Sequence, residues 1–185
     1  MQQSAISYFA DMVTCPVLAL GLSSLAFARF SKSAIVEWAL FVLVGFALWT
    51  LVEYAMHRLI YHHILPFKRY HEAHHENPRA YVGAPPLLGT FLVFLASFVP
   101  FVMVAPIIAN GVSVGMLAGY TLYMFIHYAI HFWEPPPGSL LYRARLRHAM
   151  HHYRDNGGNF GVSTSFWDRV FGTRIQRVME HSLAS

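Results

Sequence analysis

The chain has 185 residues, of which 56% are hydrophobic and 12% are charged, and its formal net charge is +4. This composition excludes a typical water-soluble domain of this length and indicates that the lipid bilayer is the solvent of the protein. The positive charge is interpreted as attraction to anionic lipid headgroups, and it gives no reason to expect a nucleic acid as a partner.

Four apolar stretches are each long enough to form a transmembrane helix. We predict spans over residues 12–29, 35–56, 86–108 and 111–132. Residues 80–133 contain no Asp, Glu, Lys or Arg, and Asn110-Gly111 is expected to form the turn between two spans in this region. The first stretch is interpreted as an anchor and not as a cleaved signal, because Asp11 and no Lys or Arg precedes it.

The strongly polar sequence lies in two blocks, residues 57–80 after the second span and residues 134–185 after the fourth. These blocks carry eleven of the thirteen Lys and Arg residues, so we predict a multi-pass protein with a cytoplasmic cap and both termini in the cytoplasm. Residues 135–137 are consecutive prolines, which end the fourth span. Residues 140–152 are predicted to form a helix at the membrane interface, with snorkelling arginines, and residues 155–173 an ordered loop.

Histidines gather in four groups, all on the predicted cytoplasmic side. The ten members are His57 and His62; His71, His74 and His75; His127 and His131; and His148, His151 and His152. Residues at i, i+3 and i+4 share a helical face, so each triplet is expected to present its imidazoles to one point. His57 and His62 are five residues apart, so we expect the helix to bend, widen or end between them, and His63 is a rival for the second place.

A concentration of ten imidazoles near one membrane face is costly unless a cation organises it. Ten ligands divide naturally into two sites of about five, whereas a structural zinc site closes at four. Imidazole suits iron, zinc, copper and nickel equally as a ligand. Two adjacent redox-active irons would activate dioxygen, so we predict two Fe ions with O2 as a co-substrate, while zinc could occupy the same sites in purified material.

The histidines lie in short motifs that resemble those of the fatty acid hydroxylase (sterol desaturase-like) superfamily. The motifs read EYAMHR (53–58) leading to His62, HEAHH (71–75), HYAIH (127–131) and HAMHH (148–152). The segment GNFGVSTSFWDRVFGT (158–173) is similar to the carboxy-terminal signature of that family, in particular of its fatty acid 2-hydroxylase branch.

This resemblance implies one all-α integral membrane domain over residues 1–185, with four transmembrane helices and a cytoplasmic helical cap that carries a di-metal site. It implies that the ten histidines above bind two metal ions and that a fatty acyl chain enters from the membrane and is hydroxylated. Many relatives also carry a fused haem-binding cytochrome domain, for which we find no segment here. We therefore expect electrons from a separate donor protein.

Three polar residues are candidates for orienting the metal ligands. Glu53 lies one helical turn before His57, where a carboxylate could hold the second ring nitrogen of a ligand. Asn159 and Asp168 could act similarly or could instead hold the glycine-rich loop. On the fourth span, four residues could form the wall of an acyl tunnel or could simply pack in the core: Tyr120, Tyr123, Met124 and Tyr128.

Two other functions remain open from the sequence. A desaturase or a sterol or carotenoid oxygenase would use the same metal site, because hydroxylation and desaturation share the first hydrogen abstraction. A histidine-rich metal transporter would instead place its ligands along a path through the membrane.

Overall fold

The structure is a computed structural model that describes residues 2–154 and 157–175. The regular elements of this part are α1 (Ala5–Arg29), α2 (Lys32–Ala55), the π-helix η1 (Met56–Tyr61), α3 (Phe67–Glu76), α4 (Leu88–Phe98), α5 (Pro106–Phe132), α6 (Leu140–Tyr153) and α7 (Phe166–Val170). The predicted cap extends beyond the described residues at 155–156 and 176–185, which include Arg177.

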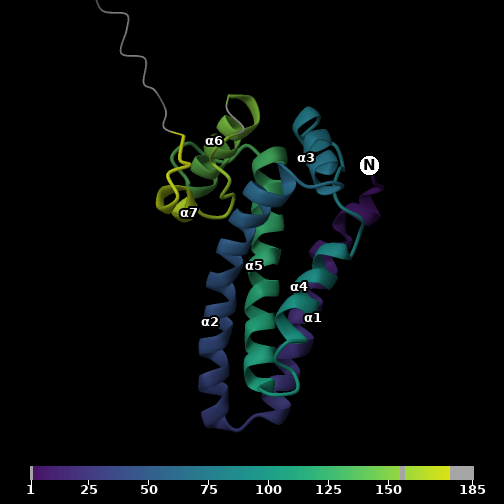
Figure 1. The fold of residues 1–185 in the computed structure, drawn as a ribbon, viewed down its shortest axis with the longest axis vertical. Coiled ribbons are helices and arrows are strands. Elements are labelled where there is room, and N and C mark those ends of the chain that lie inside the picture. The colour runs from purple at the N-terminus through teal and green to yellow at the C-terminus, as the bar shows by residue number, and fades with distance from the viewer. Residues whose placement is uncertain (1, 155–156, 176–185) are drawn as a thin grey trace, which may run out of the picture.

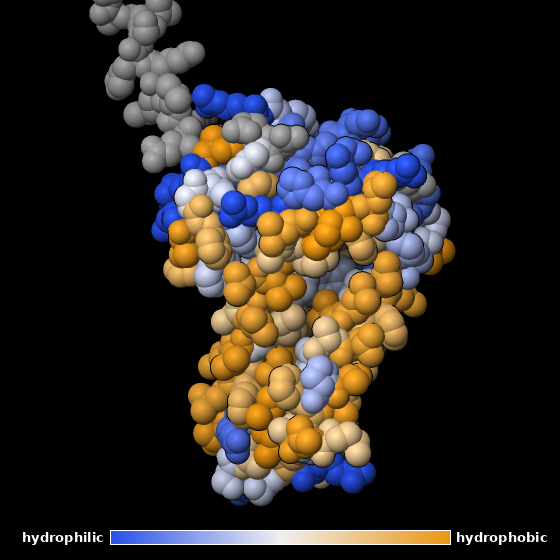
Figure 2. Space-filling view, in the orientation of Figure 1, coloured by the Kyte–Doolittle hydropathy of each residue, from blue (hydrophilic) through white to orange (hydrophobic). Residues whose placement is uncertain are grey.

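Helices α1, α2, α4 and α5 form an elongated body, and α3, α6 and α7 form a cap at one end of it (Figure 1). The N-terminus lies at the same end as the cap, so the chain runs along the body four times. The surface of the body is predominantly hydrophobic and that of the cap predominantly hydrophilic (Figure 2). This division is the one expected of a membrane protein with a polar cap.

Three helices of the described part are long and apolar enough to cross a membrane. They are Ala5–Arg29, the continuous segment Lys32–Tyr61, and Pro106–Phe132. Helix α4 has 11 residues, and at a rise of about 1.5 Å per residue it is shorter than the hydrocarbon core. The third predicted span, residues 86–108, is therefore represented by a short helix and the turns that follow it.

The predicted turn at Asn110-Gly111 is wrong. The chain turns at residues 99–105, and α5 begins at Pro106, because proline is accommodated at the first helical position. Asn110 is buried inside α5, where its side chain accepts a hydrogen bond from the Trp38 indole (2.7 Å) and donates one to the carbonyl oxygen of Leu22 (3.0 Å). This asparagine therefore ties three helices together inside the body.

Helix α5 is the central element and packs against α1, α2 and α4. Its contact with α2 is close because glycines face backbone atoms of the other helix. A Cβ atom on Gly115 would collide with the carbonyl oxygen of Val42, and one on Gly45 would collide with that of Val112. Small residues at helix crossings allow this approach in membrane proteins. The packing fixes the cap end of α5 alongside α2, which continues into η1.

The predicted end of the fourth span and the helix predicted over residues 140–152 are confirmed. Helix α5 ends at Phe132, before the three prolines, and α6 covers Leu140–Tyr153. The Ser139 hydroxyl caps α6 by accepting the backbone N–H of Tyr142 at 3.1 Å. The predicted loop at residues 155–173 contains the short helix α7.

Candidate metal centre

The ten histidines converge in two clusters where the cap meets the body. The first cluster consists of His57, His62, His71, His75 and His151, and the second contains His74, His131, His148 and His152. In each of these sets the potential ligand atoms lie within 4.8 Å of one another. His127 adjoins the second cluster, because its Nε2 lies 3.3 Å from that of His131. With His127, each cluster has five imidazoles.

Contrary to the expectation from the sequence, the two triplets do not each point to a single site. Helix α3 gives His71 and His75 to the first cluster and His74 to the second, whereas α6 gives His148 and His152 to the second and His151 to the first. On a helix, positions i and i+4 differ by about 40°, while i+3 lies about 60° to the other side of i. Each triplet therefore straddles the two clusters, and His75 stacks on His152 between them, with 4.0 Å between ring centroids.

The remaining members come from the ends of two long helices. His127 and His131 lie on α5, His57 is the second residue of the π-helix η1, and His62 directly follows that helix. The expected widening of the helix between His57 and His62 is confirmed. A π-helix pairs residues i and i+5, so it aligns two side chains that an α-helix would separate by about 140°. The two rings accordingly stack with centroids 5.4 Å apart, whereas His63 lies outside both clusters.

Backbone carbonyls set the tautomers of two ligands. Nδ1 of His57 lies 2.6 Å from the carbonyl oxygen of Phe160, and Nδ1 of His151 lies 2.8 Å from that of Gly158. A carbonyl oxygen only accepts, so each neutral ring carries its proton at Nδ1 and leaves a lone pair at Nε2. These two Nε2 atoms lie 3.0 Å apart. Facing lone pairs repel each other unless a cation is bound beside them, so the donor set fits a metal ion.

A buried nitrogen atom in the second cluster also fits a bound metal ion. The Nε2 atom of His74 is buried and has no hydrogen-bond partner among the described residues. A buried polar atom without a partner is costly, and a bound cation would satisfy it.

Burial lowers the pKa of three clustered histidines outside the long helices, His62, His74 and His148. It lowers the pKa of His62 from its ordinary value of 6.5 to about 4, and the neighbouring His75 ring lowers this pKa further. It lowers the pKa of His74 to about 3, with His131 contributing next. The pKa of His148 is also held far below its usual range by burial. At neutral pH these rings are therefore in the neutral form that binds metals.

The three residues predicted to orient the ligands act on the loop that carries Gly158 and Phe160. Glu53 contacts no imidazole in the described part, and its carboxylate accepts the backbone N–H groups of Val162 (2.7 Å) and Ser163 (2.8 Å). The Ser163 hydroxyl donates to the same carboxylate. The carboxylate of Glu53 thus holds the loop through three hydrogen bonds.

Asp168 and Asn159 have the loop-holding role that was the alternative. Asp168 is fully buried and accepts the backbone N–H groups of Phe160 and Gly161, both at 2.9 Å. Asn159 donates to the carbonyl oxygen of Arg147 and accepts the N–H of Ile175. The groups that hold the ligands are backbone carbonyls, which sequence reasoning missed because every residue has one.

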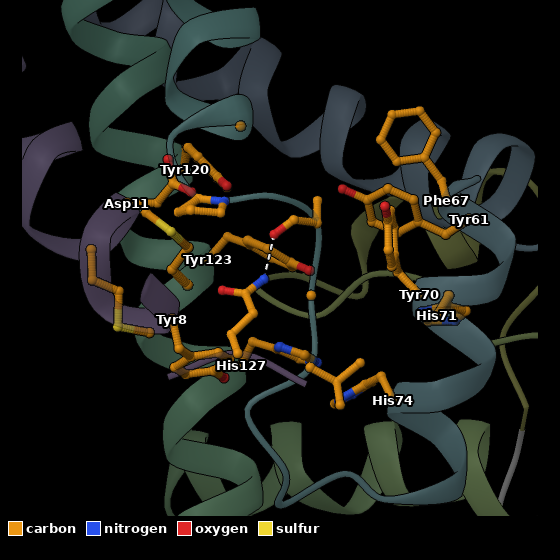
Figure 3. A pocket seen from close by; sticks show the side chains of 18 of the residues that line it. Tyr8, Asp11, Tyr61, Phe67, Tyr70, His71, His74, Tyr120, Tyr123 and His127 are labelled. Atoms are coloured by element: carbon orange, nitrogen blue, oxygen red, sulfur yellow. Dashed lines mark hydrogen bonds between the residues drawn. The ribbon is translucent and has the colours of Figure 1, made fainter. Parts of the chain in front are cut away.

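A cavity of about 180 Å³ adjoins both clusters. Figure 3 shows His71, His74 and His127 beside it, with tyrosines from η1, α1, α3 and α5 around them. Of the predicted tunnel residues, Tyr120, Tyr123 and Met124 line the cavity, while Tyr128 packs on Phe132. The N-terminal segment lines one side of the cavity, where the Gln3 amide donates to the carbonyl oxygen of Ala84.

Comparison with known proteins identifies relatives of this arrangement. Residues 42–173 match the family model described as fatty acid hydroxylase. The fatty acid 2-hydroxylase of Mus musculus is 35% identical over 122 residues, which are 64% of this chain and 32% of that protein. The ceramide very long chain fatty acid hydroxylase scs7 of Schizosaccharomyces pombe is 35% identical over 115 residues, which are 60% of this chain and 29% of that protein.

The fold has a counterpart among solved structures. A structure described as full-length scs7p, with only the hydroxylase domain visible, superposes with a TM-score of 0.78 and 25% sequence identity. The superposition covers 92% of this chain and 67% of that one. The matched part of the sequence corresponds to about a third of the length of the curated relatives.

Proposed function

The chain belongs to the fatty acid hydroxylase family, and we propose that it is a membrane di-iron oxygenase that hydroxylates a fatty acyl chain. The observation that carries this proposal is the pair of five-histidine clusters beside one cavity. Relatives named as fatty acid 2-hydroxylases and ceramide fatty acid hydroxylases support the choice of an acyl substrate. The gathering of all ten imidazoles at the cap end of the body favours an oxygenase over a transporter, whose ligands would follow a path across the membrane.

The ligand set would hold two ions, one in each cluster. Imidazole alone does not select iron over zinc, and the choice of iron rests on the reaction proposed. When bound, two redox-active ions supply the activation of O2 that breaks an unactivated C–H bond. The chain contributes neutral imidazoles, and it holds at least two of them in a fixed tautomer through the carbonyls of Gly158 and Phe160.

The cavity would position one segment of the acyl chain at the metals and exclude water there. Its volume of about 180 Å³ is smaller than the roughly 300–1,000 Å³ of sites that bury a whole drug-sized ligand. The rest of a long acyl chain would therefore remain among membrane lipids. The aromatic side chains of Tyr61, Tyr120 and Tyr123 give the cavity walls on which an apolar chain can pack.

We further propose that α1, α2 and α5 cross the membrane and that the cap lies in the cytoplasm. Helix α4 and the turns that follow it would form the remaining membrane segment. The concentration of Lys and Arg in the cap supports this orientation. Electrons would come from a separate donor protein on the same side.

The proposal is tested by expressing the chain in a bacterial host with a suitable reductase and comparing acyl lipids by mass spectrometry. We expect acyl chains that have gained one oxygen atom with the wild type and with His63→Ala, and none with His151→Ala. The loss of two hydrogen atoms instead of a gain of oxygen would replace hydroxylation by desaturation. Lipids that do not differ between wild type and His151→Ala would overturn the oxygenase proposal.

A further inference from the structure

A second hollow lies between α6, the segment from Ser163 to Ile175 and the part of α5 around Phe125 and Ile126. Its volume is about 1,080 Å³. It shares no lining residue with the cavity at the histidines, so an acyl chain at the metals would not fill it. The proposed reaction leaves this hollow without a role.

Four arginines line the hollow. Arg143 and Arg147 lie one turn apart on α6, Arg169 lies on α7, and Arg174 follows that helix. No Asp or Glu is among its lining residues, and none of the four arginines forms an ion pair with a carboxylate of the described residues. Arg169 donates only to Ser165, through its main-chain carbonyl and its hydroxyl. The hollow therefore concentrates four positive charges with no carboxylate in its lining.

Arg147 is the least satisfied of these residues. Its Nε atom is buried and has no hydrogen-bond partner in the described part of the chain. It lies within electrostatic range of the Asp168 and Glu53 carboxylates and of the guanidinium groups of Arg169 and Arg174. Asp168 gives its oxygens to the backbone of the loop. A bound anion would supply the missing acceptor and relieve the repulsion among the guanidinium groups.

The other side of the hollow is apolar. Phe125 and Ile126 belong to the long helix α5, and Leu140 at the start of α6 is 83% exposed. The hydrophobic body meets the hydrophilic cap directly below these elements (Figures 1 and 2). A ligand of this hollow thus needs an anionic group and an apolar part next to it.

We propose that this hollow binds an anionic membrane lipid, with the phosphate group on Arg143 and Arg147 and an acyl chain along Phe125 and Leu140. Guanidinium groups pair with phosphate oxygens through two hydrogen bonds at once, and basic pockets at membrane interfaces bind lipid headgroups. The site does not depend on the oxygenase reaction. The hollow lies against α6, and three other residues of this helix are histidines of the two clusters.

Native mass spectrometry of the full chain, released from nanodiscs of phosphatidylglycerol and phosphatidylcholine, tests the proposal. The wild type is expected to retain phosphatidylglycerol in preference to phosphatidylcholine. Arg143→Gln/Arg147→Gln is expected to lower that retention by roughly 10- to 30-fold, from about 1 kcal/mol for each cation near a lipid surface. Arg69→Gln/Arg154→Gln removes the same charge at exposed cap positions outside the hollow and is expected to retain the lipid.

Another variant and two competitors distinguish a lipid site from a folding defect, a phosphate site and a protein-docking surface. Arg143→Lys/Arg147→Lys keeps the charge and is expected to retain most of the lipid, which also controls for a folding defect in the glutamine variant. Equal retention by the two glutamine double variants would overturn the proposal, as would complete displacement of the lipid by inorganic phosphate. If Arg143→Gln/Arg147→Gln retained the lipid but lost binding to an acidic electron-transfer protein, the hollow would be a protein-docking surface and the lipid proposal would be overturned. Each readout uses metal-free protein, so failure of the oxygenase proposal leaves the test intact.

Discussion

Glu53 and Val162 are joined across 109 residues by a hydrogen bond of 2.7 Å, from the backbone N–H of Val162 to the Glu53 carboxylate. Glu53 is only 3% exposed. Two residues before Val162, the carbonyl oxygen of Phe160 holds Nδ1 of His57. A carboxylate near the end of α2 therefore positions the loop that orients a histidine of the first cluster.

This relationship predicts the effect of Glu53→Gln. The amide keeps the shape of the side chain but replaces a charged acceptor of three hydrogen bonds by a neutral one. We expect a loss of about 2–3 kcal/mol in the free energy of unfolding and roughly 10-fold weaker metal binding. Chemical unfolding in detergent and metal titration measure the two effects. Glu37→Gln, at an exposed position of the same helix, is the control, and equal behaviour of both variants would contradict the assigned role.

The neighbouring residues His62 and His63 provide a matched pair. His62 belongs to the first cluster, with its Nε2 3.1 Å from that of His71, whereas His63 belongs to neither cluster. We expect His62→Ala to weaken metal binding in the first cluster by more than roughly 100-fold, since even residues that only orient ligands contribute 10- to 100-fold. His63→Ala should bind metal as the wild type does. The metal content after dialysis checks this, and the reverse result would assign the place to His63.

Acid should destabilise the metal-free protein. The pKa of His62 is lowered to about 4 and that of His74 to about 3, mainly by burial, whereas both titrate near 6.5 in the unfolded chain. Below pH 6.5 the unfolded state binds protons that the folded state does not. The free energy of unfolding therefore decreases as the pH is lowered, and for His62 this decrease continues to about pH 4. Unfolding curves across this window check the direction. His62→Gln/His74→Gln should show a shallower pH dependence, and a stability that rises on acidification would be inconsistent with neutral buried histidines.

The size of the cavity is controlled where α4 meets α5. A Cβ atom on Gly89 would collide with the hydroxyl of Tyr120, and both residues line the cavity. Because the collision is with the tip of a side chain, we expect Gly89→Ala to fold and to hold metal normally. The displaced ring should lower kcat/KM for acyl substrates by roughly 10-fold, as a small misplacement near a site can cost up to 100-fold. Gly21→Ala, which has open space around the new atom, is the control, and equal activities would show that the cavity does not hold the substrate.

The sequence was most informative where periodicity and chemistry coincide. The apolar stretches predicted the long helices. Eight histidines predicted from their helical spacing converge where the cap meets the body, together with His57 and His62, which only the resemblance selected. The five-residue step from His57 to His62 correctly predicted an irregular helix, because an α-helix cannot align such a pair.

Features set by tertiary contacts were not predictable in the same way. Asn110-Gly111 has the local signature of a turn, but a partner for the asparagine on another helix and a close approach to α2 keep both residues inside α5. The distribution of each histidine triplet over two clusters depends on where α3 and α6 lie relative to each other. The carbonyls of Gly158 and Phe160 have no side-chain signature at all.

The most direct test of the di-iron account is one measurement on purified protein loaded with Fe(II) and supplied with an acyl substrate, a reductant and ¹⁸O₂. We expect two irons per chain and a hydroxylated acyl product whose new oxygen carries the label. A protein that binds about one metal ion and consumes no oxygen, or a product whose hydroxyl oxygen comes from water, would contradict it.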